Sequence, residues 1–209
     1  MPSPTFFNLP DAKRQRLMDA VWNEFTAYSY IDASINRIVQ ASAISRGSFY
    51  QYFSGKQDVF SYILCTIMEK AKDMFLAQLT VHSNDLFSAV LGMYELMLWK
   101  QTRGKPDPAI TKIQTLIKLN AELDMSMFTE HLDHQIMEQS MMDLLEQAGY
   151  HMESPVECSA LIHMLASVTL SNLTDTMRRP GCEAHNRQIL EQQMEMIRRA
   201  LDCRKTQCV

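Results

Sequence analysis

The sequence lacks any apolar run that approaches the ~20 residues needed to cross a bilayer. Its N-terminus also lacks the charged, apolar and small-residue pattern of a secretory signal. The five cysteines are odd in number, widely scattered and without a Cys-x-x-Cys pair, which favours reduced thiols over disulfides. They are Cys65, Cys158, Cys182, Cys203 and Cys208. From these absences we expect a cytoplasmic protein without a membrane segment.

Signatures of catalysis are absent as well. The sequence contains no glycine-rich phosphate loop, no nucleophile elbow and no cysteine in a catalytic setting. Glu130, His131, His134 and Glu138 have a spacing that can hold a metal on one helical face. Because no further ligand lies nearby in the sequence, we interpret them as a solvated helix face. We therefore expect no catalytic residues, no metal and no cofactor.

Residues 34–53 have the pattern of two short helices joined by a tight turn. Ser34 suits the N-cap of the first helix, and the apolar residues that follow it at helical spacing are Ile35, Ile38 and Val39. The turn lies at residues 42–44, and Ser45 can cap the second helix through its side-chain oxygen. This pattern is typical of a DNA-recognising helix-turn-helix, although any helical hairpin with aromatic anchors looks similar.

The second helix of this motif carries the side chains suited to DNA. Phe49 and Phe53, four residues apart, predict a buried face that anchors it. The residues expected toward solvent or along its flanks are Arg46, Gly47, Ser48, Tyr50, Gln51 and Tyr52. Arginine and glutamine can form paired hydrogen bonds with base edges, and a tyrosine hydroxyl suits a phosphate oxygen. A glycine lets the backbone come close to DNA.

Charge is unevenly distributed over a chain whose formal net charge is −4. Residues 1–60 carry six basic and five acidic side chains, which gives +1 and leaves −5 for the remainder. A nearly neutral N-terminal part has only modest non-specific attraction to DNA, so a few directed contacts decide its affinity. The charge pattern therefore indicates a sequence-selective protein rather than one that coats DNA.

From residue 17 to residue 59 the chain resembles the N-terminal domain of the TetR family of transcriptional regulators. The residues that carry the resemblance are Leu17-Met-Asp-Ala20, Phe25, Tyr30, Ser34-Ile35, Ile38, Ile44-Ser45, Gly47-Ser48, Phe49-Tyr50, Tyr52-Phe53 and Lys56. Ser29 and Ala43 stand where that family usually has glycine, and both cost more than glycine wherever the backbone needs a positive φ. The resemblance implies an all-α protein, with a three-helix DNA-binding domain over residues 1–55 and a helical effector-binding and dimerisation domain over residues 56–209.

The resemblance also implies which residues contact DNA. The implied set is Asn36, Arg37, Ser45, Arg46, Gly47, Ser48, Tyr50, Gln51, Tyr52 and Lys56. Within it, the residues expected to face bases are Arg46, Ser48 and Gln51, and those expected to hold phosphates are Tyr50, Tyr52 and Lys56. The two residues at the start of the motif's first helix add contacts nearby.

Outside the motif, the sequence indicates helices throughout. Residues 1–9 are expected to form a loose arm, and Pro10 with Asp11 suits the first turn of a helix. Lys56 opens a long helix that joins the two domains. Polar breaks at residues 82–85, 103–108, 149–155 and 178–181 divide the remainder into five or six helices. Ser154 and Glu157 form a capping box with a proline at the first helical position.

The last two helices resemble the pair that forms the dimer interface of this family. The resemblance thus implies a homodimer, which would bind a palindromic operator with half-sites about one helical turn, ~34 Å, apart or somewhat more. On the last helix, apolar residues at spacings of four, three and four form a seam made of Leu190, Met194, Ile197 and Leu201. That seam can pack on a partner or, alternatively, inside its own chain.

Sixteen methionines are unusual, and many fall in the C-terminal part. Methionine adapts to apolar guests, so with aromatic residues it can line a pocket for a flexible or aromatic hydrophobic effector. The candidate lining is Phe75, Met93, Tyr94, Met97, Trp99, Phe128 and Met164. Each methionine can equally be a packing residue, and the pocket itself is implied only by the resemblance.

Together these features predict a DNA-binding regulator, and most directly a repressor released from its operator by a small hydrophobic ligand. The alternative is a hydrophobic-ligand carrier or enzyme whose N-terminal hairpin docks protein rather than DNA. A third interpretation is a structural interaction protein that has no ligand.

Overall fold

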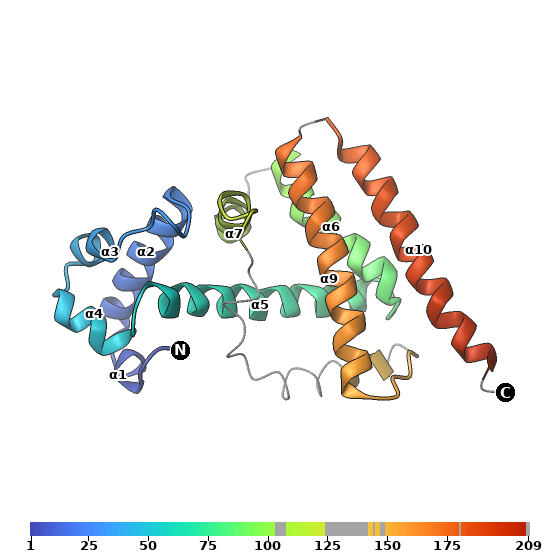
Figure 1. The fold of residues 1–209 in the computed structure, drawn as a ribbon, viewed down its shortest axis with the longest axis horizontal. Helices are drawn as coiled ribbons and strands as arrows, with labels where there is room; N and C mark the ends of the chain where they lie inside the picture. Colours follow the sequence, from blue (N-terminus) through green and yellow to red (C-terminus); the bar gives the residue numbers. More distant parts are fainter. Residues whose placement is uncertain (103–107, 124–141, 144, 147–148, 180, 208–209) are drawn as a thin grey trace. The chain divides into compact units, whose positions relative to one another are not determined.

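Every regular element that the computed structural model describes is a helix (Figure 1). The described residues are 1–102, 108–123, 142–143, 145–146, 149–179 and 181–207. The helices are α1 (Pro4–Phe7), α2 (Asp11–Ala27), α3 (Ile35–Ser42), α4 (Arg46–Tyr52), α5 (Lys56–Val81), α6 (Leu86–Thr102), α7 (Pro108–Leu119), α9 (Pro155–Arg178) and α10 (Glu183–Gln207). The prediction of an all-α protein is confirmed.

The helices divide into two units, each with its own internal contacts. The first unit contains residues 1–71 together with α7, and the second contains residues 72–102 together with α9 and α10. Helix α5 contributes residues to both units, because its residues 56–71 belong to the first and its later residues to the second. The predicted domain boundary after residue 55 lies directly before this helix.

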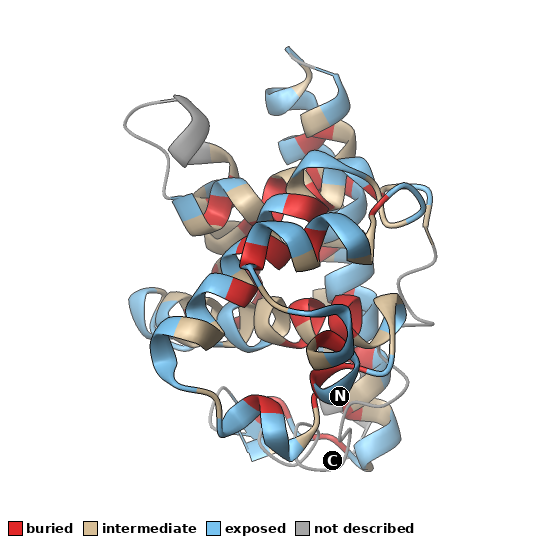
Figure 2. Ribbon diagram, turned by 90° about the vertical axis from the view of Figure 1, so that its left-hand side faces the viewer, coloured by how far each residue is buried: buried red, intermediate tan, exposed pale blue. Residues whose placement is uncertain are grey.

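The core of the first unit is formed by the inward faces of its helices (Figure 2). On α2, Leu17, Val21 and Phe25 are completely buried, as their spacing of four residues predicts. The aromatic anchors Phe49 and Phe53 are buried in the same cluster. Because α2 and α4 share one set of packed side chains, a change in the core of this unit also reaches the helix-turn-helix.

The N-terminal residues are not a loose arm, and that prediction is wrong. Residues 4–7 form helix α1, and Phe6 is completely buried in the core of the first unit. The ring of Phe6 lies 5.0 Å from that of Phe53 and 5.4 Å from that of Tyr62, measured between centroids. In addition, the Ser3 backbone N–H donates to the Tyr52 carbonyl at 2.9 Å. A segment this short shows no helical period in sequence, although a serine before a proline does suit a helix start.

The turn between α3 and α4 uses a left-handed residue. Ala43 has φ 53° and ψ 42°, a region where a Cβ crowds the following carbonyl oxygen. Ser29, the other position at which the resemblance suggested glycine, is not among the described residues with positive φ. Its hydroxyl instead donates to the Asp32 carboxylate at 2.7 Å. Of the two positions, only Ala43 therefore carries a backbone cost.

Replacing Ala43 by glycine is expected to raise the free energy of unfolding of the first unit by about 0.5–1 kcal/mol. The gain is the removed left-handed strain, ~1–2 kcal/mol, less the entropy of a more flexible unfolded chain, ~0.4–1 kcal/mol. Urea unfolding followed by Trp22 fluorescence, with Trp99 replaced by phenylalanine, measures it. The matched control is Ser29→Gly, which removes a hydrogen bond and relieves no strain, so equal stabilisation by both variants would contradict the account.

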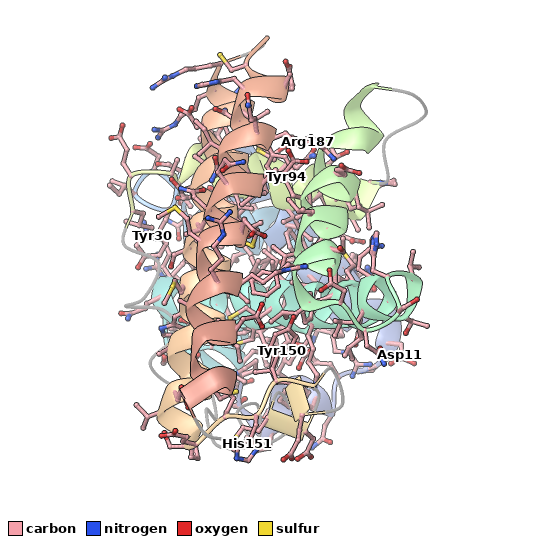
Figure 3. All side chains as sticks on the ribbon, turned by 90° about the vertical axis from the view of Figure 1, so that its right-hand side faces the viewer. Asp11, Tyr30, Tyr94, Tyr150, His151 and Arg187 are labelled. Atoms are coloured by element: carbon pink, nitrogen blue, oxygen red, sulfur yellow. The ribbon has the colours of Figure 1, made fainter. Side chains whose placement is uncertain are left out.

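In the second unit, helices α6, α9 and α10 pack on one another around buried polar groups. The Tyr94 hydroxyl of α6 lies 2.9 Å from the Thr176 hydroxyl of α9, and Asn186 of α10 donates to the same Thr176 oxygen at 3.0 Å. Figure 3 labels Tyr94 on α6 and Arg187 on α10, whose guanidinium pairs with Glu95 at 2.8 Å. Because each group has a partner, this network fixes the relative register of the three helices.

The first turn of α9 confirms the predicted helix start. The Ser154 hydroxyl accepts a hydrogen bond from the Glu157 backbone N–H at 3.2 Å, and Pro155 is the first helical residue. The Glu157 carboxylate accepts from the Glu153 N–H at 2.8 Å, one residue earlier than a standard capping box requires. The backbone N–H groups of Glu153 and Glu157, on either side of the helix start, therefore both have a hydrogen-bond acceptor.

Candidate nucleic-acid interface

Helices α3 and α4 form the predicted helix-turn-helix. The Ser45 hydroxyl accepts from the Ser48 backbone N–H at 3.0 Å, so the predicted cap of α4 is confirmed. Ser34 occupies the N-cap position of α3, but its hydroxyl caps no backbone group there. Its backbone N–H instead donates to the Glu24 carboxylate at 2.7 Å. The start of α3 is therefore held by a side chain of α2.

One face of α4 is buried and the other is polar and exposed. Arg46, Gly47, Tyr50 and Gln51 are exposed, and Ser48 is half-buried. Figure 2 shows this alternation of exposed and buried positions over the short helices of the first unit. The exposed side chains of α4 can therefore contact a molecule that binds at this surface.

Tyr52 does not point outward, and that prediction is wrong. Its side chain is only 4% exposed and belongs to the core cluster of the first unit. The reason is helical spacing, because Tyr52 lies three residues after the buried Phe49 and shares its face. The Lys13 ammonium of α2 lies 5.9 Å from the centre of the Tyr52 ring.

Arg46 joins the exposed surfaces of α3 and α4. Its guanidinium donates to the Asn36 side-chain oxygen at 2.6 Å and to the Tyr50 hydroxyl at 3.4 Å. The same guanidinium lies 5.7 Å from the centre of the Tyr50 ring. Asn36, Arg46 and Tyr50 thus form one exposed cluster that spans the motif, which we call the Arg46 cluster.

Arg37 is turned toward α2. Its Nε donates to both carboxylate oxygens of Glu24, at 2.9 and 3.1 Å, and its guanidinium carbon lies 4.0 Å from the centre of the Tyr28 ring. It also donates to the Asp32 carbonyl at 2.8 Å. The hydrogen bond to Glu24, despite some desolvation, raises the pKa of Arg37 above its ordinary value. Arg37 therefore fastens α3 to α2.

Lys56, at the first position of α5, contacts the loop that precedes α3. Its ammonium donates to the carbonyls of Ile31 at 2.9 Å and Ala33 at 3.1 Å, and lies 4.9 Å from the centre of the Tyr30 ring. Burial raises the pKa of Tyr30. The Tyr30 backbone N–H donates to the side chain of Asn120, directly after α7, at 2.7 Å. Lys56 thus links α5 to the helix-turn-helix.

The predicted effector residues are in varied surroundings. Tyr94 and Met97 are buried, Phe75 and Met93 are half-buried, and Met164 is 49% exposed. Burial raises the pKa of Tyr94, whose hydroxyl is already bonded to α9. The side chains of Trp99 and Phe128 lie outside the described residues, as do the four residues with metal-like spacing, 130–138. Within the described part of the chain, no three metal-ligating side chains come together.

Sequence reasoning missed Glu24, the carboxylate on which α3 depends. Glu24 is only 6% exposed and accepts hydrogen bonds from both Arg37 and Ser34. A signal was present, because Glu24 stands beside Phe25 and three residues after Val21, in the apolar stripe of α2. A charged residue in such a stripe indicates a buried partner.

Residues 17–63 match the family model described as "Bacterial regulatory proteins, tetR family". This segment of the chain is a tetR-type domain. The matched range contains the whole helix-turn-helix, the Arg46 cluster and the Glu24–Arg37 pair, so these features lie inside the tetR-type domain.

Several known proteins are similar to part of this chain. It is 28% identical over 81 residues to "Uncharacterized HTH-type transcriptional regulator YdgC" of Bacillus subtilis, covering 37% of this chain and 42% of that protein. It is 34% identical over 53 residues to "HTH-type transcriptional regulator SrpR" of Pseudomonas putida, covering 25% of each. The match to "Uncharacterized HTH-type transcriptional regulator TtgW" of the same species has the same identity and length, and covers 40% of that protein. The chain thus spans less than half the length of the curated relatives it matches.

A solved structure also resembles the chain over nearly its full length. It is that of a TetR family transcriptional regulator from Chloroflexus aurantiacus, with 21% identity and a TM-score of 0.43. The likeness covers 96% of this chain and 98% of that one.

Proposed function

We propose that this protein, with its tetR-type domain, is a cytoplasmic, homodimeric transcriptional regulator that binds a palindromic operator. In this proposal it acts as a repressor, and a small hydrophobic effector held by the second unit releases it from DNA. The observation that carries the proposal is the exposed polar face of α4, set on buried aromatic anchors inside the tetR-type domain. A helix of this kind enters the major groove with its N-terminal residues against base edges.

The contacts of α4 and its neighbours suggest which residues contact bases, which bind phosphates and which position the motif. Arg46 and Gln51 are exposed and can form paired hydrogen bonds with bases, while the Tyr50 hydroxyl suits a phosphate. Asn36 holds the Arg46 guanidinium at 2.6 Å and so limits its directions of approach. Arg37 and Lys56 each join two elements of the first unit. Their main proposed role is to position the motif, and a contact with phosphate is a second role.

The homodimer is proposed to form through α9 and α10. Leu190 and Met194 of the predicted seam are buried within their own chain, so that part of the seam is intramolecular. Other apolar residues of the two helices remain exposed, namely Val156, Met164, Leu170, Ile189 and Met196. Helix α9 is long and apolar enough to cross a membrane, yet most of its apolar stretch is not buried within its own chain. A second copy packed on these faces would cover them.

Selection of bound duplexes from a random DNA pool by the purified protein tests the proposal. Recovery of an inverted repeat is the expected result, because a two-fold dimer presents two copies of α4 to two half-sites. The selected repeat then serves as the probe for variants and for a screen of effectors. If no sequence is enriched, DNA recognition is not supported, and a carrier of hydrophobic ligands becomes the better hypothesis.

Two variants of α4 are expected to affect DNA binding differently. Gln51→Ala should weaken binding by ~1–3 kcal/mol at one base position of each half-site and relax the preference there. Tyr50→Phe keeps the ring beside Arg46 but removes the hydroxyl, so it should weaken binding about equally for all sequences. Affinities for the selected operator and for single-base variants measure both effects. The exposed Gln57 of α5 supplies a control, and a Gln57→Ala effect as large as that of Gln51→Ala would contradict the assignment.

A further inference from the structure

A cavity of about 300 Å³ lies in the first unit, between α2, α5 and α7. Its apolar wall includes the indole of Trp22 from α2 with Pro108 and Ile113 from α7. Two lysines, Lys70 of α5 and Lys112 of α7, also line it. The cavity is distinct from the predicted effector residues, which belong to other parts of the chain.

The charges around this cavity favour an anion. Among the described residues, no ion pair or hydrogen bond is formed by the side chain of Lys70 or of Lys112. Asp19 is the acidic residue of the lining, and its carboxylate already accepts from the Gln15 amide at 2.9 Å. Two lysines and one aspartate therefore line the cavity, which gives its lining a formal net charge of +1. The first residues of α7 add the positive end of a helix dipole to the same wall.

We propose that this cavity binds a small aromatic monocarboxylate. The ring would stack on Trp22 against the apolar wall, and the carboxylate would lie between Lys70 and Lys112. A volume near 300 Å³ is at the lower end of the range for small-molecule sites, so it suits one aromatic ring with its acid group. The site goes beyond the proposed function, because it is built in the first unit and its ligand is an anion.

The class of ligand follows from comparing three probes of nearly equal shape. Fluorine NMR titrations with 4-fluorobenzoate, 4-fluorobenzamide and 4-fluorobenzamidine separate an anion, a neutral amide and a cation on one ring. We expect 4-fluorobenzoate to bind ~5-fold or more tightly than the amide, and the amidine to bind most weakly. Perturbation of the Trp22 indole N–H signal, assigned with Trp99 replaced by phenylalanine, places the probe in this cavity.

Charge-removing variants locate the carboxylate. Lys70→Gln and Lys112→Gln should each raise the Kd for 4-fluorobenzoate ~3- to 10-fold, and leave the amide unaffected. The exposed Lys118 of α7 provides the control, since Lys118→Gln removes the same charge from the same helix outside the cavity.

Several results would overturn the proposal. These are no binding of 4-fluorobenzoate, equal binding of acid and amide, preference for the amidine, or an effect of Lys118→Gln equal to that of Lys112→Gln. Tighter amidine binding would show that Asp19 dominates the site. None of these measurements involves DNA, so their failure leaves the proposed operator binding to its own test.

Discussion

Replacing Phe6 by alanine is expected to destabilise the first unit by about 3 kcal/mol. The side chain is completely buried and packs on the rings of Phe53 and Tyr62. Removing a buried phenylalanine costs ~3–5 kcal/mol through lost burial and the cavity left behind. The lower end applies, because a terminal segment can detach instead of leaving an empty cavity. Urea unfolding followed by Trp22 fluorescence, again with Trp99 replaced by phenylalanine, measures the change.

The same variant should also weaken operator binding. Ser3 donates from its backbone N–H to the Tyr52 carbonyl at 2.9 Å and from its hydroxyl to the Gln51 carbonyl at 2.5 Å. These acceptors are the last carbonyls of α4, which would otherwise have no intrahelical partner. When Phe6 no longer holds the segment in place, α4 loses both donors at the end of the helix proposed to enter the groove.

Phe7 offers a control within the same four-residue helix. It is the same residue type one position later, but it is 52% exposed and packs only on ring edges. Phe7→Ala is therefore expected to cost ~1 kcal/mol or less. If Phe6→Ala and Phe7→Ala have equal effects on unfolding and on operator binding, the segment is not anchored as described.

The features that can be predicted from the sequence are those set by local periodicity. The repeat of Leu17, Val21 and Phe25 predicts the buried face of α2, and the serine at position 45 predicts the cap of α4. Each of these depends on residues within one or two turns of helix, where geometry is fixed by the helix itself. Local periodicity and capping are therefore sufficient to place the helix-turn-helix along the chain.

The features that sequence reasoning missed depend on contacts between distant residues. Sequence reasoning did not indicate that the Lys56 ammonium, predicted to hold a phosphate, also bonds to carbonyls 23 and 25 residues earlier. The ring of Phe6 packs on that of Phe53, at the far end of the helix-turn-helix in the sequence, and no local period predicts such a contact. Tyr52 is a different case, because its spacing of three residues from Phe49 places it on the buried face of α4, whereas the resemblance placed it at a phosphate. For that residue, periodicity was the better guide.

Replacing Arg37 by alanine is expected to destabilise the first unit by about 2–3 kcal/mol. Glu24 is 6% exposed, and without Arg37 its buried charge keeps only the Ser34 N–H as a described partner. Removing one member of a buried ion pair costs ~3–5 kcal/mol, because the other charge is left uncompensated. The expected loss is smaller here, because the Arg37 side chain is itself 44% exposed and solvent partly screens its charge. The same urea unfolding experiment on Trp22 fluorescence gives the value.

A double-mutant cycle separates this pair from a general surface effect. With Glu24→Ala in place, Arg37→Ala should cost ~1 kcal/mol or less, because no buried carboxylate remains to be stranded. Arg16→Ala, which removes an exposed arginine from α2, should stay within ~0.5 kcal/mol of the parent. Additive losses from Glu24→Ala and Arg37→Ala would mean that the two side chains are not coupled. The coupling matters for DNA recognition, because the Glu24 carboxylate accepts hydrogen bonds from Ser34, directly before α3, and from Arg37 within α3. Loss of that carboxylate would leave α4 capped and anchored by Phe49 and Phe53, but would remove the polar contacts that hold α3 to α2.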